Sequence, residues 1–394
     1  MNRILKMILL LLLISTIDLV LGQEKDIIGY YPSWSWRDRN QLVNSKTIPY
    51  EKLTIINYAF FIPLPDGKIV GKDPEADSHL LKGKLDSLTG DIIPNTSLIE
   101  IAHQQNVKVL ISIGGWEDSD NFPQVAADAD KRANFAYWCV KHLKDYGFDG
   151  IDIDWEYPGY VPHNGMPQDK QNFTLLLQTV RDSLNLLEKE TGKYYLLSAA
   201  MPATYSHTQK IEIENVARIL DFMNIMTYDF FGPWDALSNH NAPLFAPAQG
   251  DPAHNFEGAF KLYHERYGVP ADRINLGVPF YGHTFSGCTE LHAKHQGGEK
   301  ELFSEIGSAS YYEIVAHIDL FSRYWDDKAQ VPYLISDSKQ LFISFDDTVS
   351  IGLKADYILK NNARGLIIWQ IMGDYFENGE TPLLDIIYHK FYTK

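Results

Sequence analysis

The feature that most constrains the fold is the alternation of short apolar runs with longer amphipathic segments. Eight runs rich in β-branched and aromatic residues predict strands, at residues 26–31, 53–61, 107–113, 150–155, 194–201, 222–228, 274–281 and 365–370. The segments between them, such as Ala126–Tyr146, Gln168–Glu190 and Phe256–Tyr267, have helical periodicity. This order predicts a parallel sheet with helical crossovers, and eight repeats favour a closed (β/α)8 TIM barrel. An open doubly wound sheet is disfavoured, because no glycine-rich phosphate loop follows the first run.

One long interval interrupts the alternation. Residues 284–343 contain short aromatic-rich pieces that match neither one helix nor one strand. A loop of that length without secondary structure is rare in a compact domain. We therefore predict a small α+β insertion domain at 284–343, between strands seven and eight, standing on the rim at the C-terminal ends of the strands. The barrel is then formed by residues 23–283 and 344–394.

The N-terminus has the pattern of a targeting segment. Arg3 and Lys6 precede an apolar run at Met7–Ile14, and a small residue, Gly22, follows. This pattern predicts a signal peptide at residues 1–22. An acidic residue interrupts the apolar stretch, so an uncleaved membrane anchor is the less favoured alternative. We expect export to an extracellular or periplasmic location, with no membrane attachment after cleavage.

The charge balance excludes several classes of partner. The formal net charge is −16, from 51 acidic and 35 basic residues. Nucleic acids and anionic membranes are bound through Lys and Arg patches, so neither is an expected partner. A neutral or weakly cationic ligand and a monomeric protein are expected. Cys139, in an apolar helical run, is expected to be a buried filler, and a disulfide with Cys288 stays open.

The segment FDGIDIDWEYP, residues 148–158, places acids at every second position. Side chains alternate across a strand, so three acids share one face and three apolar residues share the other. The acids are Asp152, Asp154 and Glu156, and the apolar residues are Ile151, Ile153 and Trp155. We expect the apolar set to pack outward under the helices. The acids must then point into the barrel.

Three inward carboxylates are costly for stability, because burial and neighbouring like charges both disfavour the ionised form. The same arrangement suits a general acid, whose carboxyl must stay protonated near neutral pH at the C-terminal end of a strand. The pattern therefore favours catalysis. A divalent cation is the minor alternative, since such sites usually draw on turn-rich loops. No cofactor and no metal are expected.

The segment DGIDIDWEYP resembles the DGxDxDxE signature of the family 18 glycoside hydrolases, the chitinase family. Further motifs follow in the family's order: SIGGW (112–116), MTYDF (226–230), GVPFYG (277–282) and GLIIWQ (365–370). They resemble the motifs of its third, sixth, seventh and eighth strands. The resemblance covers nearly all of the mature chain. It implies a secreted chitinase, endo-acting, that hydrolyses β-1,4-linked N-acetylglucosamine polymers such as chitin.

The resemblance also implies a role for individual residues. Glu156 matches the acid/base, Asp154 holds the substrate's acetamido group and shares charge with Asp152, and Tyr228 fixes the acetamido carbonyl. Trp369 matches the aromatic floor beneath the distorted sugar, and Trp116 and Trp234 look like platforms for its neighbours. The residues expected to bind substrate or to support its site are Tyr30, Phe60, Ser112, Gly115, Trp116, Met226, Asp229, Trp234 and Trp369.

The family is an exception to the two-carboxylate retaining mechanism, because the substrate itself supplies the nucleophile. The resemblance implies that the N-acetyl oxygen attacks the anomeric carbon while Glu156 protonates the leaving oxygen. Water then opens the oxazolinium ion with Glu156 as base, so configuration is retained. A substrate without an acetamido group beside the scissile bond, such as cellulose, should not be cleaved.

The chain departs from the family pattern at His283, where arginine is common. This change could alter a sugar contact or the pH dependence. Two alternative functions stay open. One is an endo-β-N-acetylglucosaminidase acting on glycoprotein or cell-wall glycans, which uses the same chemistry. The other is a chitinase-like lectin, which is disfavoured because Glu156 is present.

Overall fold

The computed structural model describes residues 25–84, 86, 88–90 and 92–393, and the predicted signal peptide lies outside them. Eight parallel strands form a closed barrel: β1 (Asp26–Pro32), β2 (Ile55–Pro63), β4 (Lys108–Gly114), β5 (Gly150–Asp154), β6 (Leu196–Pro202), β7 (Phe222–Met226), β8 (Ile274–Pro279) and β14 (Gly365–Trp369). Their order is β1-β14-β8-β7-β6-β5-β4-β2, and β2 pairs back with β1. A short strand, β3 (Ile69–Gly71), adds antiparallel to β2. The predicted (β/α)8 barrel is confirmed.

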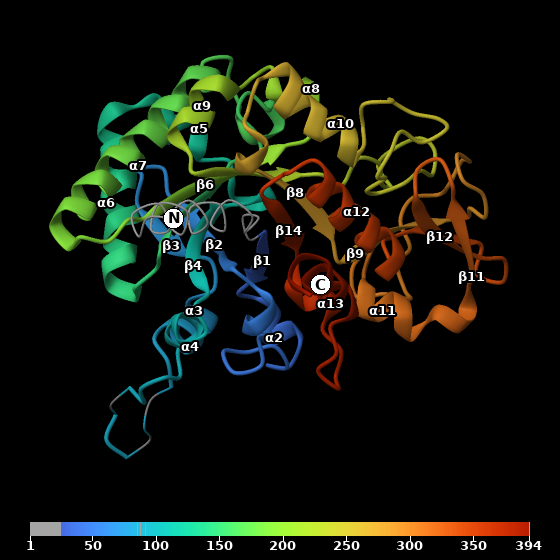
Figure 1. Ribbon diagram of the computed structural model, residues 1–394, viewed down its shortest axis with the longest axis horizontal. Coiled ribbons are helices and arrows are strands. Elements are labelled where there is room, and N and C mark those ends of the chain that lie inside the picture. The colour runs from blue at the N-terminus through green and yellow to red at the C-terminus, as the bar shows by residue number, and fades with distance from the viewer. Residues whose placement is uncertain (1–24, 85, 87, 91, 394) are drawn as a thin grey trace, which may run out of the picture.

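Helices surround the barrel (Figure 1). They are α2 (Ser35–Asp38), α3 (Pro74–Leu81), α4 (Leu98–Gln104), α5 (Phe122–Ala127), α6 (Ala129–Tyr146), α7 (Asp169–Thr191), α8 (Tyr205–Thr208), α9 (Ile213–Ile219), α10 (Phe256–Lys261), α12 (Thr348–Lys360) and α13 (Pro382–Tyr392). The helix predicted to start at Ala126 is divided in two, because Asp128 caps α6 by accepting from the backbone N–H groups of Asp130 and Lys131. No helix in the described part of the chain is long and apolar enough to cross a membrane.

A second, antiparallel sheet stands beside the barrel, on the right in Figure 1. Its order is β10-β9-β13-β12-β11, from β9 (Tyr281–Ser286), β10 (Ser308–Ser310), β11 (Ser322–Asp326), β12 (Val331–Ser336) and β13 (Leu341–Ser344), with α11 at Tyr311–Ala316. The predicted insertion began at residue 284, whereas this sheet begins at Tyr281. The backbone N–H of Phe280 still donates to Trp369 of the barrel, and Tyr281 already pairs with Ser310. The sheet therefore grows directly out of the seventh barrel strand, β8.

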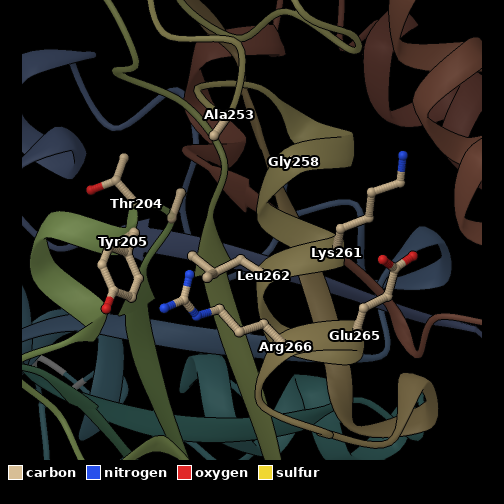
Figure 2. Close-up of a pocket in the computed structure, with 9 residues that line it drawn as sticks. Thr204, Tyr205, Ala253, Gly258, Lys261, Leu262, Glu265 and Arg266 are labelled. Carbon is tan, nitrogen blue, oxygen red and sulfur yellow. The ribbon is translucent and has the colours of Figure 1, made fainter.

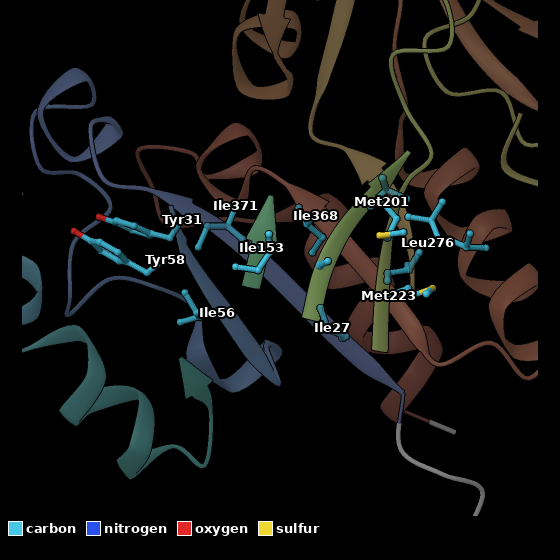
Figure 3. Packing of buried hydrophobic residues seen from close by; sticks show 14 of the residues in the cluster. Ile27, Tyr31, Ile56, Tyr58, Ile153, Met201, Met223, Leu276, Ile368 and Ile371 are labelled. Carbon is cyan, nitrogen blue, oxygen red and sulfur yellow. The ribbon is translucent and has the colours of Figure 1, made fainter. Parts of the chain in front are cut away.

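The apolar face of β5 packs outward, as predicted. Ile151, Ile153 and Trp155 belong to the large core between barrel and helices, and Figure 3 shows Ile153 within that layer. Trp155 stacks on Phe122 with ring centroids 5.3 Å apart and meets Phe173 edge-on at 5.6 Å. Burying this face fixes the register of β5, since a slip of one residue would turn it towards the barrel interior.

The two cysteines are buried and free. Cys139 lies on α6 within the outer core, which confirms its prediction as a buried filler. Cys288 belongs to a small cluster in the second sheet with Phe285 and Phe342. The disulfide that the sequence left open is therefore absent between them.

The buried carboxyl of Asp77 on α3 gives a prediction about stability. Tyr58 Oη donates to Asp77 Oδ1 at 2.7 Å, and burial, followed by the charge of Asp73, raises the pKa of Asp77 to about 7. The folded protein thus holds this proton more tightly than the unfolded chain, so stability falls as pH rises from about 4 to about 7. Asp77→Asn removes the buried charge and keeps an acceptor for Tyr58. We expect a variant more stable than wild type at pH 8 by about 1 kcal/mol, and nearly equal at pH 4, in thermal unfolding.

The exposed Asp145→Asn on α6 is the matched control for Asp77→Asn, because Asp145 lies in a surface pair with Lys141. Its unfolding temperature should follow wild type at both pH values. An Asp77→Asn protein that unfolds at a lower temperature than wild type at pH 8 would show that the carboxylate stabilises the fold.

Candidate active site

A groove of about 1040 Å³ opens where the barrel strands end, just above the upper range of ~300–1,000 Å³ that is common for ligand sites. Most of the predicted site residues line it. They are Tyr30, Phe60, Trp116, Asp154, Glu156, Met226, Tyr228, Asp229, Trp234 and Trp369. Because these residues come from six different barrel strands and the loops that follow them, the closed barrel is what brings them together.

Asp152 lies beneath the groove and is fully buried. Its carboxylate accepts four hydrogen bonds, one from each of the barrel strands β1, β4, β6 and β7. The donors are Tyr30 Oη (2.9 Å), Ser112 Oγ (2.8 Å), Ser198 Oγ (2.6 Å) and Asn224 Nδ2 (3.1 Å). Burial raises the pKa of Asp152, and these donors oppose that rise. Ser112 is buried behind this carboxylate and does not line the groove, so its place is a supporting one.

Asp154 borders the groove, and its carboxyl has fewer hydrogen-bond partners than that of Asp152. Its residue is 3% exposed, and its Oδ1 has no hydrogen-bond partner within the described residues. Burial raises the pKa of Asp154 well above its ordinary value, and the charges of Glu156 and Asp152 add to that effect. A buried oxygen without a donor is unfavourable, so a ligand N–H or O–H placed here would gain a strong interaction.

Glu156 follows two residues after the end of β5. Its backbone N–H donates to Ser119 Oγ at 2.8 Å, and its carbonyl oxygen lies 2.6 Å from His163 Nδ1. Burial raises the pKa of Glu156 to about 7, the charge of Asp229 adds to the rise, and a hydrogen bond with Tyr157 opposes it. A carboxyl that titrates near neutral pH is suited to both donate and accept a proton in one catalytic cycle.

Aromatic side chains form the surfaces of the groove. The Trp369 ring stacks on Phe60 with centroids 5.7 Å apart and an interplanar angle of 15°. The centroid of the Tyr30 ring lies 5.8 Å from that of Trp369. Trp116 and Trp234 are 51% and 63% exposed. Large exposed aromatics beside a groove indicate a ligand with flat apolar faces.

Gly115, Met226 and Tyr228, which the sequence also placed at the site, contribute to the groove in different ways. Gly115 does not line the groove. It has φ 93°, and a Cβ there would lie 2.5 Å from the Phe60 ring, so glycine is what leaves room for that ring. Met226 and Tyr228 are buried but line the groove. Burial, followed by the charge of Asp154, raises the pKa of Tyr228, so its hydroxyl keeps its proton and can donate.

Sequence reasoning missed two tyrosines. Tyr157 hydrogen-bonds the Glu156 carboxyl, and Tyr281 Oη donates to Asp229 Oδ1 at 2.6 Å. Strict alternation would turn Tyr157 outward, but β5 ends at Asp154 and the alternation ends with it. Tyr281 could have been found from the GVPFYG motif, where a polar aromatic ends an apolar run.

A second pocket of about 390 Å³ adjoins the groove and shares Ala203 and Thr204 with it. Figure 2 shows Tyr205 beside the guanidinium of Arg266 there, and the Arg266 carbon Cζ is 3.9 Å from the ring centroid. None of the predicted site residues lines this pocket. Among the residues that the structure describes, the groove included, no group of three or more His, Cys, Asp or Glu side chains could hold a metal ion.

The sequence model of the glycosyl hydrolases family 18 matches residues 26–374. This chain belongs to that family. It is a glycoside hydrolase, and the predicted resemblance is confirmed. Chitinase A1 of Niallia circulans is 38% identical over 399 residues, covering 88% of this chain and 56% of that protein. The chain thus spans a little more than half of that relative's length.

Solved structures of chitinases have the same fold. A chitinase from Bacillus thuringiensis matches with a TM-score of 0.82 and 33% identity, over 94% of this chain and 70% of that one. Catalytic domain 2 of the Group II chitinase of Ostrinia furnacalis, a mutant in complex with penta-N-acetylchitooctaose, matches with a TM-score of 0.83 and 27% identity. That match covers 94% of this chain and 97% of the other.

Proposed function

We propose that this glycoside hydrolase is an exported chitinase that cleaves β-1,4-linked N-acetylglucosamine polymers with retention of configuration. The observation that carries the proposal is the contrast among three neighbouring carboxyls. Asp152 has four donors, Asp154 has an oxygen without a donor, and Glu156 has a pKa of about 7. Export rests on the signal-peptide pattern of residues 1–22.

The groove offers an acetamido group both partners that it requires. Asp154 Oδ1 is an acceptor without a donor, suited to the acetamido N–H. The Tyr228 hydroxyl lines the same groove as a protonated donor, suited to the acetamido carbonyl. An acetamido group held in this way has its oxygen placed for attack on the anomeric carbon, so the substrate supplies the nucleophile.

The reaction then proceeds in two balanced steps. The acetamido oxygen forms a bond to the anomeric carbon as the bond to the leaving oxygen breaks, and Glu156 gives its proton to that oxygen. The Asp154 carboxylate stabilises the positive oxazolinium ion. Water next attacks the anomeric carbon and loses a proton to Glu156, which restores both the acetamido group and the carboxylic acid. Two displacements at one carbon retain its configuration.

The exposed platforms favour a linear chitin chain over a branched glycan. Trp116 follows β4 and Trp234 follows β7, and both line the groove with about half or more of their surface exposed. Flat rings spaced along a groove match the repeated apolar faces of a linear β-1,4 polymer. An endo-β-N-acetylglucosaminidase would have the same catalytic acid and the same acetamido site. The two functions are therefore distinguished by which substrate the enzyme cleaves.

Product analysis tests the proposed substrate. A pentamer of β-1,4-linked N-acetylglucosamine should be cleaved, whereas cellopentaose should react slower by ~10³-fold or more, because it has no acetamido nucleophile. A high-mannose glycoprotein, assayed in parallel, should keep its glycan. Release of that glycan with an intact chitin pentamer would assign the endo-β-N-acetylglucosaminidase function instead. Comparable cleavage of cellopentaose would contradict the substrate-assisted mechanism.

A further inference from the structure

The second pocket, of about 390 Å³, shares a wall with the catalytic groove. That wall consists of two short segments, each of which borders both cavities. In the first segment, after β6, Tyr205 lines the pocket and His207 lines the groove. In the second, before α10, Ala253 lines the pocket and His254 lines the groove. The two cavities are therefore neighbours, and they meet where residues 203–204 line both of them.

An unusual helical turn forms the other side of the pocket (Figure 2). Residues Leu262–Arg266, directly after α10, are π-helical. Such turns are rare, and they occur frequently at functional sites. This one contributes Glu265 and Arg266 to the pocket. On α10 itself, a Cβ at Gly258 would lie 2.3 Å from the carbonyl oxygen of Ala253. Glycine at this position therefore allows the loop to lie against the helix, so that both border one pocket.

Tyr205 and Arg266 form a stacked pair in this pocket. The guanidinium of Arg266 lies over the Tyr205 ring, with Cζ 3.9 Å from the ring centroid. Within the described residues, the N–H groups of this guanidinium donate to no acceptor. Tyr205 itself is 44% exposed. A flat ring can stack on the apolar face of a sugar, and a planar guanidinium beside it can donate to the sugar's oxygens. The pair therefore has the chemistry of a carbohydrate site.

The charges that line the pocket favour a neutral ligand. Lys261 lies 3.1 Å from Glu257, so its charge already has a partner. The Glu265 side chain has no hydrogen bond or ion pair within the described residues, so the pocket offers a free acceptor as well as the free Arg266 donor. An anion would be repelled by Glu265 and by the net charge of −16, and a cation by Arg266. Hydroxyl and acetamido groups both donate and accept, so a neutral sugar suits both side chains.

We propose that this pocket is a second carbohydrate-binding site, which holds a sugar unit of a chain that extends out of the catalytic groove. The inference rests on the proposed function of the groove. Because the two cavities meet at residues 203–204, one linear chain can pass from the groove into the pocket without a break. Stacking on Tyr205 and hydrogen bonds from Arg266 then add affinity only for a chain long enough to reach them. The pocket thus gives the protein a preference for long chains.

Titration calorimetry with a trimer and a heptamer of β-1,4-linked N-acetylglucosamine tests this inference. The parent protein is Glu156→Gln, which prevents cleavage during the titration. Adding Tyr205→Ala removes the ring, and adding Arg266→Ala removes the donors. Each change should weaken heptamer binding roughly tenfold and trimer binding less than about twofold, because only the heptamer reaches the pocket. Adding Tyr205→Phe, which keeps the ring, should leave heptamer affinity within about twofold of the parent.

Arg218→Ala is the matched control, because Arg218 is exposed on α9 and lines neither cavity. Its binding of both oligomers should equal that of the parent. A wild-type protein that does not hydrolyse the chitin pentamer refutes the proposed function. If wild type does hydrolyse it, equal heptamer affinity with and without Arg266→Ala and Tyr205→Ala overturns the role of the pocket, and so does an equal loss of affinity for both oligomers. If a variant unfolds, nitrogen-15 NMR of Arg266 Nε in the parent decides. Its signal should shift when the heptamer is added, and an unmoved signal overturns the inference.

Discussion

Replacing Glu156 by glutamine is expected to lower kcat on the chitin pentamer by roughly three orders of magnitude, with little change in affinity. Glutamine keeps the shape of the side chain but has no carboxyl proton to transfer. In wild type, burial and the charge of Asp229 keep the pKa of this carboxyl near 7, so the proton is available at neutral pH. Without it, the leaving oxygen departs unprotonated, which is the slow uncatalysed path.

The matched control for this substitution is Glu190→Gln. Glu190 is exposed at the end of α7 and pairs with Lys144 on α6, away from the groove. Its kcat and its binding of the pentamer, measured by titration calorimetry, should equal those of wild type. Turnover by Glu156→Gln within tenfold of wild type would remove this residue from the acid/base role.

Asp154→Asn should lower kcat by roughly 10²-fold and move the alkaline limb of the kcat profile to lower pH. The loss in rate follows because the Asp154 carboxylate stabilises the positive oxazolinium ion, and asparagine has no charge to do so. The shift follows because the charge of Glu156 raises the pKa of Asp154, and repulsion between two neighbouring carboxylates acts on both of them. With one charge removed, Glu156 ionises more readily, and its acid form disappears at a lower pH.

Asp145→Asn, an identical change in a surface pair on α6, is the control for this prediction. Its kcat profile should coincide with that of wild type. If kcat of Asp154→Asn falls but the alkaline limb of its profile is unchanged, Asp154 does not affect the pKa of Glu156. An unchanged rate would remove Asp154 from the mechanism altogether.

The barrel and the inward orientation of the acids could be predicted because two repeating patterns are clear in this sequence. They are the helical period of 3.6 residues and the strand period of two residues. Runs such as 26–31 and 365–370 fall within one or two residues of β1 and β14. The isoleucines of β5 and the tryptophan that follows it are buried against helices, so the acids of this segment have only the barrel interior to face. Period-two patterning with one apolar face determines both the element and its orientation.

The finer geometry depends on contacts between strands that are distant in sequence. Ser198 and Asn224 are polar residues within the apolar runs of β6 and β7, yet only the register of those strands places both beside Asp152. Likewise, His283 reaches Asp229 because β9 leaves the barrel immediately after β8. Local patterns predict elements and faces, whereas such pairings are set by the closed barrel and the second sheet.

The stereochemistry of cleavage tests the central claim most directly. Proton NMR during early hydrolysis of the chitin pentamer, before the product equilibrates, reports the configuration of the newly formed reducing end. We predict that the β-anomer appears first, as two successive displacements at the anomeric carbon require. Initial release of the α-anomer would mean direct attack by water, and would contradict a substrate-assisted reaction with Glu156 as acid and base.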